Sequence, residues 1–456
     1  MIKIRFQVKN MEAKREQIAN TKTFSDYLYL WVGQNISYFG SAIVVFIIIL
    51  QLSGNENYIL SVAALLSFGP SILFGTVAGV VADRFNKKVI ILITDSLQTL
   101  ATLALIVLYY VVIDVQIWQI YIISIIRGIC QAFHGPVVMS LTPLMVPQEK
   151  LSRMNGIGYL FNSLIGVLGP ILGAQILFVL NISVRDSLWI DIITYVIAVI
   201  PLFIIKIPQI KSTHEEGATN GEHLKSKSFF GDMKEGFATI RTISGLLSLM
   251  LMASIINLLL QPLDVLFPNF IMVELEQTPV IYAYASAGFP IGILVGSLIT
   301  FIKKKWKNES KWIFWGLLTV YLFYGLLFLP KILPEGFFFL IYIFSFFMGL
   351  SIPLVNVLVI TIVQKSVPLD KMGRVSSLLM VLSSIASPIG MIGAGFVADA
   401  LDMVPFIRIS TGGIGFLYLI CSVIGFLIGI GSWFFTDWRK ISSNVEEEEE
   451  KIDKLK

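Results

Sequence analysis

The sequence predicts an all-α polytopic membrane protein in which twelve transmembrane helices form two pseudo-symmetric bundles of six. Three observations support this fold class: the composition, the succession of apolar stretches and an internal repeat. Of the 456 residues, 56% are hydrophobic and only 14% are charged, whereas a soluble domain carries about 25% charged residues. The composition therefore excludes a soluble multidomain protein and a nucleic-acid-binding protein.

Twelve apolar stretches follow one another along the chain, and each is long enough for a helix of about 20 residues that crosses the bilayer. They lie near 24–50, 58–81, 89–113, 116–140, 155–180, 187–207, 243–273, 279–302, 312–331, 336–363, 375–400 and 405–435. Their residues are apolar throughout and do not alternate with polar ones, which excludes the strands of a membrane β-barrel.

The basic residues orient these helices, because Lys and Arg are retained on the cytoplasmic side of a membrane. Of the 34 basic residues, 30 fall in the two ends of the chain and in the even-numbered connections. We therefore expect a multi-pass protein of the plasma membrane with both termini in the cytoplasm. No apolar run precedes Phe24, so the first residues are expected to be a cytosolic tail and not a signal peptide. The predicted parts are a tail at 1–23, a bundle at 24–207, a cytosolic linker at 208–242, a second bundle at 243–435 and an acidic cytosolic tail at 436–456.

An internal repeat relates the two bundles. VPQEKLSRMNG at 146–156 aligns without gaps with VPLDKMGRVSS at 367–377, and both segments join the fourth to the fifth helix of their half. Two six-helix repeats of the same orientation are typical of transporters whose binding site lies between the halves. A channel or a membrane enzyme does not need this duplication.

The loop after the second helix, GVVADRFNKKVII at 79–91, resembles the signature of the major facilitator superfamily. Three further segments resemble the drug exporters of the macrolide-efflux type within this superfamily, namely RGICQAFHGP, FSDYLYLWVGQNISYFG and VPQEKLSRMNG. The resemblance implies the major facilitator fold and a cytoplasmic latch in which Asp83 holds the inward side closed. The latch residues are Gly79, Asp83, Arg84, Asn86, Lys87 and Lys88. The family has Gly where this chain has Asn86, and Asn is the residue that next best tolerates the left-handed conformation expected in so tight a turn.

A second motif, GVLGPILGA at 166–174, lies in the fifth helix and resembles an element that the superfamily associates with exporters and antiporters. Gly166, Gly169 and Gly173 allow close helix packing, and Pro170 permits bending. Packing alone remains an alternative explanation of this motif, whereas the resemblance favours export.

Polar residues inside the membrane are the candidates for chemistry, because each charge costs at least about 2.5 kcal/mol at the bilayer centre. One polar stripe on the fourth helix consists of Ser124, Arg127, Gln131 and His134. Arg127 is expected to take part in transport or in a structural ion pair. His134 is more simply explained as a packed or capping residue. Asn257, Gln261 and Asp264 form a similar stripe on the seventh, which Pro262 and Pro268 are expected to break. The predicted substrate cavity comprises Gln34, Asn35, Tyr38, Arg127, Gln131, Asn257, Gln261, Asp264 and Asn356.

A buried carboxyl group can load and release a proton near neutral pH, because burial disfavours its charged form. The candidates are Asp264, which we rank first, Asp191 and Asp95. Either of the last two has the alternative of being a structural partner of a basic group, for example Asp95 of Arg84 or Arg127. The sequence has no GxxxxGK[ST] loop or HExxH cluster. We therefore expect that the protein is not an enzyme and that it has neither a cofactor nor a metal site. The favoured function is a monomeric proton antiporter that exports bulky amphipathic compounds. An uncoupled or uptake facilitator for a nutrient, or a transporter of lipid between leaflets, is the alternative.

Overall fold

The computed structural model describes residues 21–112, 115–205, 207–208, 237–303, 306, 308–334, 336–367 and 372–440. Twelve helices in these ranges are long and apolar enough to cross a membrane, which confirms the predicted number. Most of the predicted linker at 208–242 and of the two predicted tails lies outside the described residues. By its internal contacts the chain divides into two compact units, residues 1–52 with 63–222 and residues 53–62 with 223–456.

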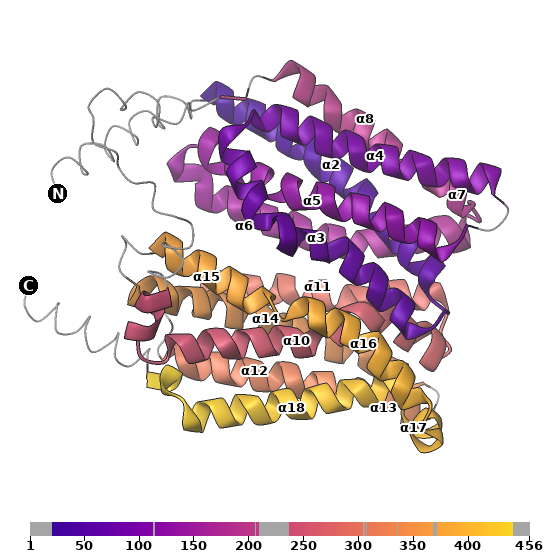
Figure 1. Cartoon of the computed structure of the whole chain (residues 1–456), viewed down its shortest axis with the longest axis vertical. Coiled ribbons are helices and arrows are strands. Elements are labelled where there is room, and N and C mark those ends of the chain that lie inside the picture. The colour runs from indigo at the N-terminus through magenta and orange to yellow at the C-terminus, as the bar shows by residue number, and fades with distance from the viewer. Residues whose placement is uncertain are drawn as a thin grey trace, which may run out of the picture. The chain divides into compact units, whose positions relative to one another are not determined.

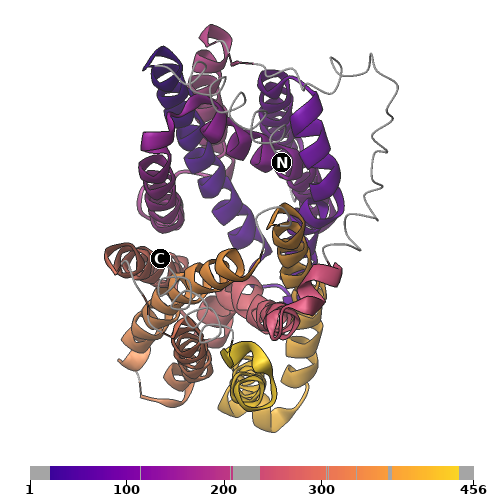
Figure 2. The same cartoon turned by 90° about the vertical axis from the view of Figure 1, so that its left-hand side faces the viewer.

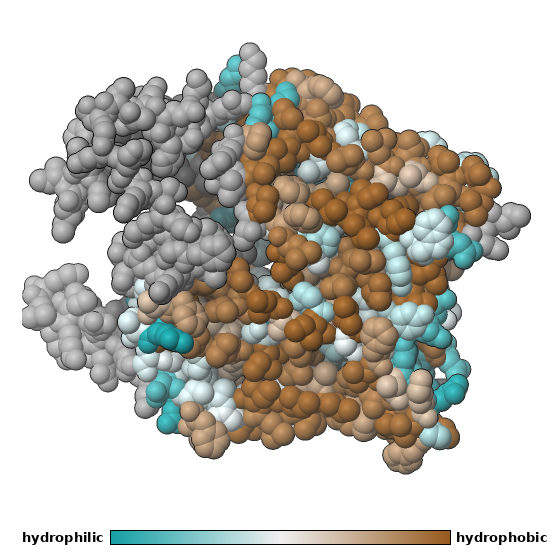
Figure 3. All heavy atoms as spheres, in the orientation of Figure 1, coloured by the Kyte–Doolittle hydropathy of each residue, from teal (hydrophilic) through white to brown (hydrophobic). Residues whose placement is uncertain are grey.

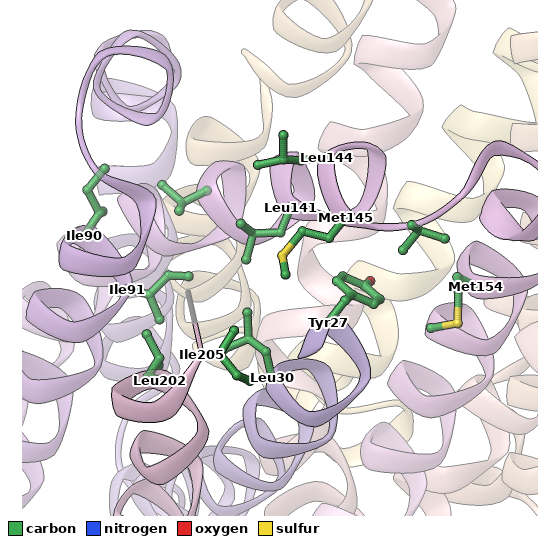
Figure 4. Packing of buried hydrophobic residues seen from close by; sticks show 12 residues of the cluster. Tyr27, Leu30, Ile90, Ile91, Leu141, Leu144, Met145, Met154, Leu202 and Ile205 are labelled. Atoms are coloured by element: carbon green, nitrogen blue, oxygen red, sulfur yellow. The ribbon is translucent and has the colours of Figure 1, made fainter. Parts of the chain in front are cut away.

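The helices of the first unit run side by side, and Figure 2 shows them gathered into a bundle. They are α2 (Thr21–Leu52), α3 (Asn57–Arg84), α4 (Lys87–Val111), α5 (Ile117–Met145), α6 (Gln148–Ala174), the π-helical turn Gln175–Val179, α7 (Val184–Ser187) and α8 (Trp189–Ile204). Buried apolar side chains from α2, α4, α5, α6 and the end of α8 fill one end of this bundle, and Leu30, Ile91, Met145 and Leu202 are among them (Figure 4). The cluster holds these helices together at the predicted cytoplasmic end.

The second unit contains the other six long helices and several short ones (Figure 1). They are α10 (Leu246–Asn269), the π-helical turn Phe270–Glu274, α11 (Pro279–Ile302), α12 (Glu309–Leu326), α13 (Leu329–Ile332), the 3₁₀ turn Phe337–Phe339, α14 (Leu340–Ser366), α15 (Met372–Ser384), α16 (Ser387–Asp402), α17 (Pro405–Ser410), α18 (Gly413–Phe435) and the 3₁₀ turn Asp437–Lys440. Glycines let α11 and α14 approach closely: Gly292 lies against the carbonyl oxygen of Phe346 and Gly296 against that of Leu350. Small residues serve the same purpose wherever membrane helices pack.

Large apolar side chains are exposed along the long helices, for example Leu73, Ile204 and Phe301, each with more than 70% of its surface accessible. On the face that Figure 3 shows, hydrophobic residues cover the middle of the helices and hydrophilic ones gather toward the ends. A soluble monomer does not expose apolar surface on this scale. The chain is therefore a multi-pass membrane protein.

The expected break at Pro262 and Pro268 is wrong, because α10 continues through both prolines. Pro262 cannot bond to the carbonyl oxygen of Leu258, and that oxygen faces Gly390 on α16. The neighbouring helix, approaching closely at a glycine, accommodates the local defect. A turn at Ile385 and Ala386 instead divides the predicted eleventh helix into α15 and α16. It comes just before Pro388, which lacks the N–H that a continuous helix requires.

Candidate functional site

A buried ion pair occupies the middle of the first unit. Arg127 Nη1 on α5 lies 3.2 Å from Asp191 Oδ2 on α8. The same Nη1 donates to Thr102 Oγ1 over 2.7 Å, and Thr102 donates to Asp191 Oδ2 over 2.6 Å. Ser41 on α2 donates to the other oxygen of Asp191 over 2.8 Å. Both oxygens of Asp191 are therefore bonded and its charge is balanced by Arg127.

A second buried polar group involves Asp95 on α4, which is 8% exposed. Its Oδ1 lies 3.2 Å from Nε2 of His134 on α5, and its Oδ2 accepts a hydrogen bond of 3.1 Å from Gln34 Nε2 on α2. Gln34 Oε1 lies 2.9 Å from the same His134 nitrogen. Three side chains from three helices thus form a closed triangle. Asp95 is not paired with Arg127, which was one of the alternatives.

The two groups form two polar layers. Both layers include side chains from α2, α4 and α5, and the spacing between the two members on each helix is regular. One layer contains Gln34, Asp95 and His134, and the other contains Ser41, Thr102 and Arg127 together with Asp191. On each of the three shared helices, the two members are seven residues apart. Seven residues are two helical turns, or about 10.5 Å along the axis, so one face of each helix supplies both layers. Sequence reasoning did not identify Ser41 and Thr102, although this spacing was the signal that could have found them.

The remaining cavity candidates of the first unit do not join these layers. Asn35 donates only to the carbonyl of Trp31 on its own helix, over 2.7 Å. Tyr38 is 48% exposed. Gln131 is also exposed and makes no hydrogen bond with any described residue.

The predicted stripe on α10 in the second unit is only partly bonded. Asn257 Nδ2 donates to the carbonyl of Ser383 over 2.9 Å, whereas the buried Oε1 of Gln261 has no partner within the described part of the chain. Asp264 and Asn356 are exposed and form no hydrogen bond or ion pair there. Because a carboxylate is rarely placed against lipid, Asp264 is expected to face water or a ligand. Glu274, an acid that sequence reasoning did not single out, instead caps α18 by accepting from the backbone N–H groups of Ile414 and Gly415.

The loop between α3 and α4 differs from expectation at Asn86. Its φ of −64° and ψ of 112° are not left-handed, and its side chain caps α4 by accepting from the N–H of Lys88. A helix that starts at once needs this cap more than it needs a left-handed residue. Lys88 Nζ donates to the carbonyls of Phe203 and Ile205 at the end of α8. The side chains of the other latch candidates Gly79, Asp83 and Arg84 lie outside the described ones, and the latch stays a prediction.

Two of the glycines in the exporter-type motif pack α6 against α2. A Cβ atom added at Gly169 would lie 3.1 Å from Ala42 Cβ, and one added at Gly173 would lie 2.8 Å from Phe46 Cδ1. The helix runs through Pro170 without a break. Close packing therefore accounts for these two positions, and a role in the direction of transport stays a prediction.

The second unit includes residues 53–62, and two polar side chains hold this segment. Asp399 on α16 accepts hydrogen bonds of 3.0 Å from the backbone N–H groups of Asn57 and Tyr58. Asn269 accepts from the N–H of Gly54 and donates to Asn57 Oδ1. An acid at a helix N-terminus binds its free N–H groups and interacts favourably with the helix dipole. Neither Asp399 nor Asn269 was identified from the sequence.

Comparisons with known proteins agree with this architecture. The family model described as Major Facilitator Superfamily matches residues 30–391. Macrolide efflux protein A of Streptococcus pyogenes is 29% identical over 400 residues, which are 87% of this chain and 95% of that protein. Macrolide efflux protein A of Enterococcus faecalis is 30% identical over 331 residues, which are 72% of this chain and 97% of that protein.

Solved structures with the same fold include a bacterial homologue of the iron transporter ferroportin. Its TM-score is 0.65 and its sequence identity is 14%, with 92% of this chain and 99% of that chain covered. A bacterial homologue of the human lysosomal transporter Spinster has a TM-score of 0.64, 14% identity, and 93% and 98% coverage.

Proposed function

Because the chain belongs to the Major Facilitator Superfamily, we propose that it is a secondary active transporter that exports bulky amphipathic compounds of the macrolide type by proton antiport and alternating access. The observation that carries the proposal is the 29% identity to macrolide efflux protein A over 87% of this chain and 95% of that protein. Such coverage includes both helical bundles and not merely one shared segment.

The polar residues of α10 support this substrate class. Gln261 has a buried oxygen without a partner, and Asp264 is exposed and unbonded among the described residues. Both retain hydrogen-bonding capacity that a solute could use. A binding site with few polar groups in an apolar surrounding suits a large amphipathic molecule better than a sugar or an inorganic ion.

Acids inside the membrane-spanning helices support proton coupling. Asp95, Asp191 and Asp264 lie within membrane-spanning helices, where ionisable residues are rare and mark proton or ion pathways. In this proposal both termini are cytoplasmic, the protein works as a monomer in the plasma membrane, and Asp83 belongs to a cytoplasmic latch. An uncoupled facilitator would need none of these acids to carry a proton.

The test is the efflux of a macrolide or a fluorescent lipophilic dye from energised cells, with and without a protonophore. We expect efflux to stop when the proton gradient collapses. Efflux that continues unchanged would favour the facilitator, and no efflux of any amphipathic compound would contradict the proposed substrate class. Drug-induced proton release from the purified Asp264→Asn, Asp191→Asn and Asp95→Asn variants then identifies the acids that coupling requires.

A further inference from the structure

We infer that Asp95 and His134, joined by Gln34, form a single proton-binding site in the first unit, while Arg127 and Asp191 form a fixed charged layer beside it. The inference rests on the proposed function in one respect, namely that the bound proton is the one exchanged for drug. The site itself follows from the geometry and the charges of the two polar layers.

The hydrogen bonds determine the orientation of Gln34. Its NH₂ group faces a carboxylate oxygen of Asp95 and its carbonyl oxygen faces the His134 nitrogen. The reverse orientation would place two acceptors, the amide oxygen and the Asp95 oxygen, against each other. Nε2 of His134 therefore faces two acceptors, Gln34 Oε1 and Asp95 Oδ1. It donates a proton to them, so an additional proton is accommodated on Nδ1 or on the carboxylate.

The additional proton makes the two polar layers electrically neutral. Arg127 and Asp191 neutralise each other at 3.2 Å. Asp95 carries one negative charge, and within the described chain the only cation at ion-pair distance from it is His134 when protonated. The two layers together thus carry a charge of −1 with neutral His134 and 0 after binding one proton. Burying an uncompensated charge is costly, so the layers gain from taking up one proton and not two.

Other groups around the pair do not change this count. Those that carry or can carry charge are Arg127 and Cys130 on α5, Asp191 and Tyr195 on α8, Asp26, Tyr27 and Tyr38 on α2, and Lys87 and Lys88 at the start of α4. The ammonium group of Lys88 bonds the carbonyl oxygens of Phe203 and Ile205 and not Asp95. Asp26 lies two turns from Gln34 along α2. On α6 the charged residues Glu149, Lys150 and Arg153 are exposed in its first two turns. Asp95 and His134 remain the pair whose shared proton changes the net charge of the layers.

Protonation of the pair also changes what holds α2. Gln34 is the only member of this layer on α2, and it bonds both Asp95 on α4 and His134 on α5. A proton on the carboxylate weakens Asp95 as an acceptor for Gln34, because hydrogen bonds to charged groups are roughly twice as strong as neutral ones. A proton on the carboxylate therefore loosens the link that Gln34 makes between α2 and α4, and Gln34 acts as a positioning residue.

The chain allows a direct test, because its other two histidines, His214 and His223, lie in the predicted linker. In the His214→Gln/His223→Gln protein, nuclear magnetic resonance of labelled imidazole reports His134 alone, and infrared difference spectra report the Asp95 carboxyl group. We expect one proton to bind to the pair, with the imidazole and carboxyl signals changing together as the pH falls. Asp95→Asn should reduce the proton affinity of His134 at least about tenfold, and His134→Gln should likewise alter the titration of Asp95. Glu149→Gln, which removes an exposed carboxylate at the start of α6 in the same unit, is the matched control and should leave both signals unchanged.

Titrations of His134 and Asp95 that are independent of each other, or that respond equally to Glu149→Gln, would overturn the inference. If Asp95→Asn does not fold, Gln34→Met is the second variant. It keeps the side-chain length, removes both hydrogen bonds, and should change both titrations. Drug-induced proton release from the reconstituted protein is measured separately. Its absence in the wild type, with a coupled Asp95–His134 titration, would contradict the proposed antiport and leave the proton site intact.

Discussion

Arg127 on α5 and Asp191 on α8 form an ion pair inside the first unit, with side chains that are only 9% and 4% exposed. Thr102 on α4 bonds to both partners and Ser41 on α2 bonds to Asp191, so the pair and its hydrogen bonds connect four helices. Breaking a buried pair leaves one charge without compensation, which costs more than removing both charges. Arg127 therefore has a structural role that any transport role must share.

We predict that Arg127→Ala and Asp191→Asn each destabilise the protein by about 3 to 5 kcal/mol, because each leaves an uncompensated buried charge. The double variant Arg127→Gln/Asp191→Asn should recover much of this loss. Thermal unfolding of the purified proteins in detergent measures the effect, with drug efflux recorded at equal protein level. A double variant no more stable than the single ones would contradict the structural role, and normal efflux by a stable double variant would exclude Arg127 from transport.

The second prediction concerns the close approach of α11 and α14. Gly292→Ala should destabilise the second unit by about 1 to 3 kcal/mol, because the added methyl group would overlap the backbone of Phe346 and overpacked helices must separate. Gly393→Ala, where nothing lies within 4 Å of the added Cβ, is the control. Equal unfolding temperatures for the two variants would mean that these helices are less tightly packed than described.

The third prediction concerns Asp399. Asp399→Ala removes the acceptor for the first N–H groups of α3 and should cost about 0.5 to 2 kcal/mol. Asp399→Asn retains one acceptor oxygen and should lose less. Hydrogen exchange of the amides of Asn57 and Tyr58 gives the local readout. Unchanged protection of both amides in Asp399→Ala would refute the capping role.

The fourth prediction concerns Lys88, whose ammonium group donates to two carbonyls at the end of α8. Lys88→Met keeps the apolar stem and removes the donors, with an expected loss of about 1 to 2 kcal/mol. Lys22→Met removes an exposed charge near the same predicted side of the membrane and serves as control. If the two variants unfold alike, Lys88 contributes only through its charge.

The fifth prediction concerns topology. A single cysteine placed in 208–242 should react with a membrane-impermeant reagent only from the cytoplasm, because the basic residues concentrate on that side. The native Cys130 and Cys421 are both buried and give little background. Labelling in intact cells from outside would reverse the proposed orientation.

The number and approximate positions of the helices could be predicted because length and hydropathy decide whether a segment crosses a membrane. Arg127, Asp95, Asp191 and His134 could also be recognised one by one as polar residues in apolar helices. Their pairing could not be predicted. Periodicity gives the polar face of one helix, but it gives neither the rotation of that helix against its neighbour nor the relative height of the two helices in the membrane.

Local backbone rules were less reliable where neighbouring structure competes with them. Asn86 was expected to be left-handed on the basis of turn length, but the helix that follows uses it as a cap. Pro262 was expected to break its helix, but α10 continues through it, and the adjacent α16 approaches closely at Gly390. The cap of Asn86 is a contact with Lys88 two residues along the chain, whereas the contact beside Pro262 comes from a helix that a local pattern does not include.

The contact between Pro262 and Gly390 also has a consequence for the residues that position 390 can hold. Pro262 leaves the carbonyl oxygen of Leu258 without its helical donor, and a Cβ at position 390 would lie 2.5 Å from that oxygen. The two residues therefore constrain each other across 128 positions of sequence. Position 390 is therefore closed to any larger residue as long as the carbonyl oxygen of Leu258 keeps this place.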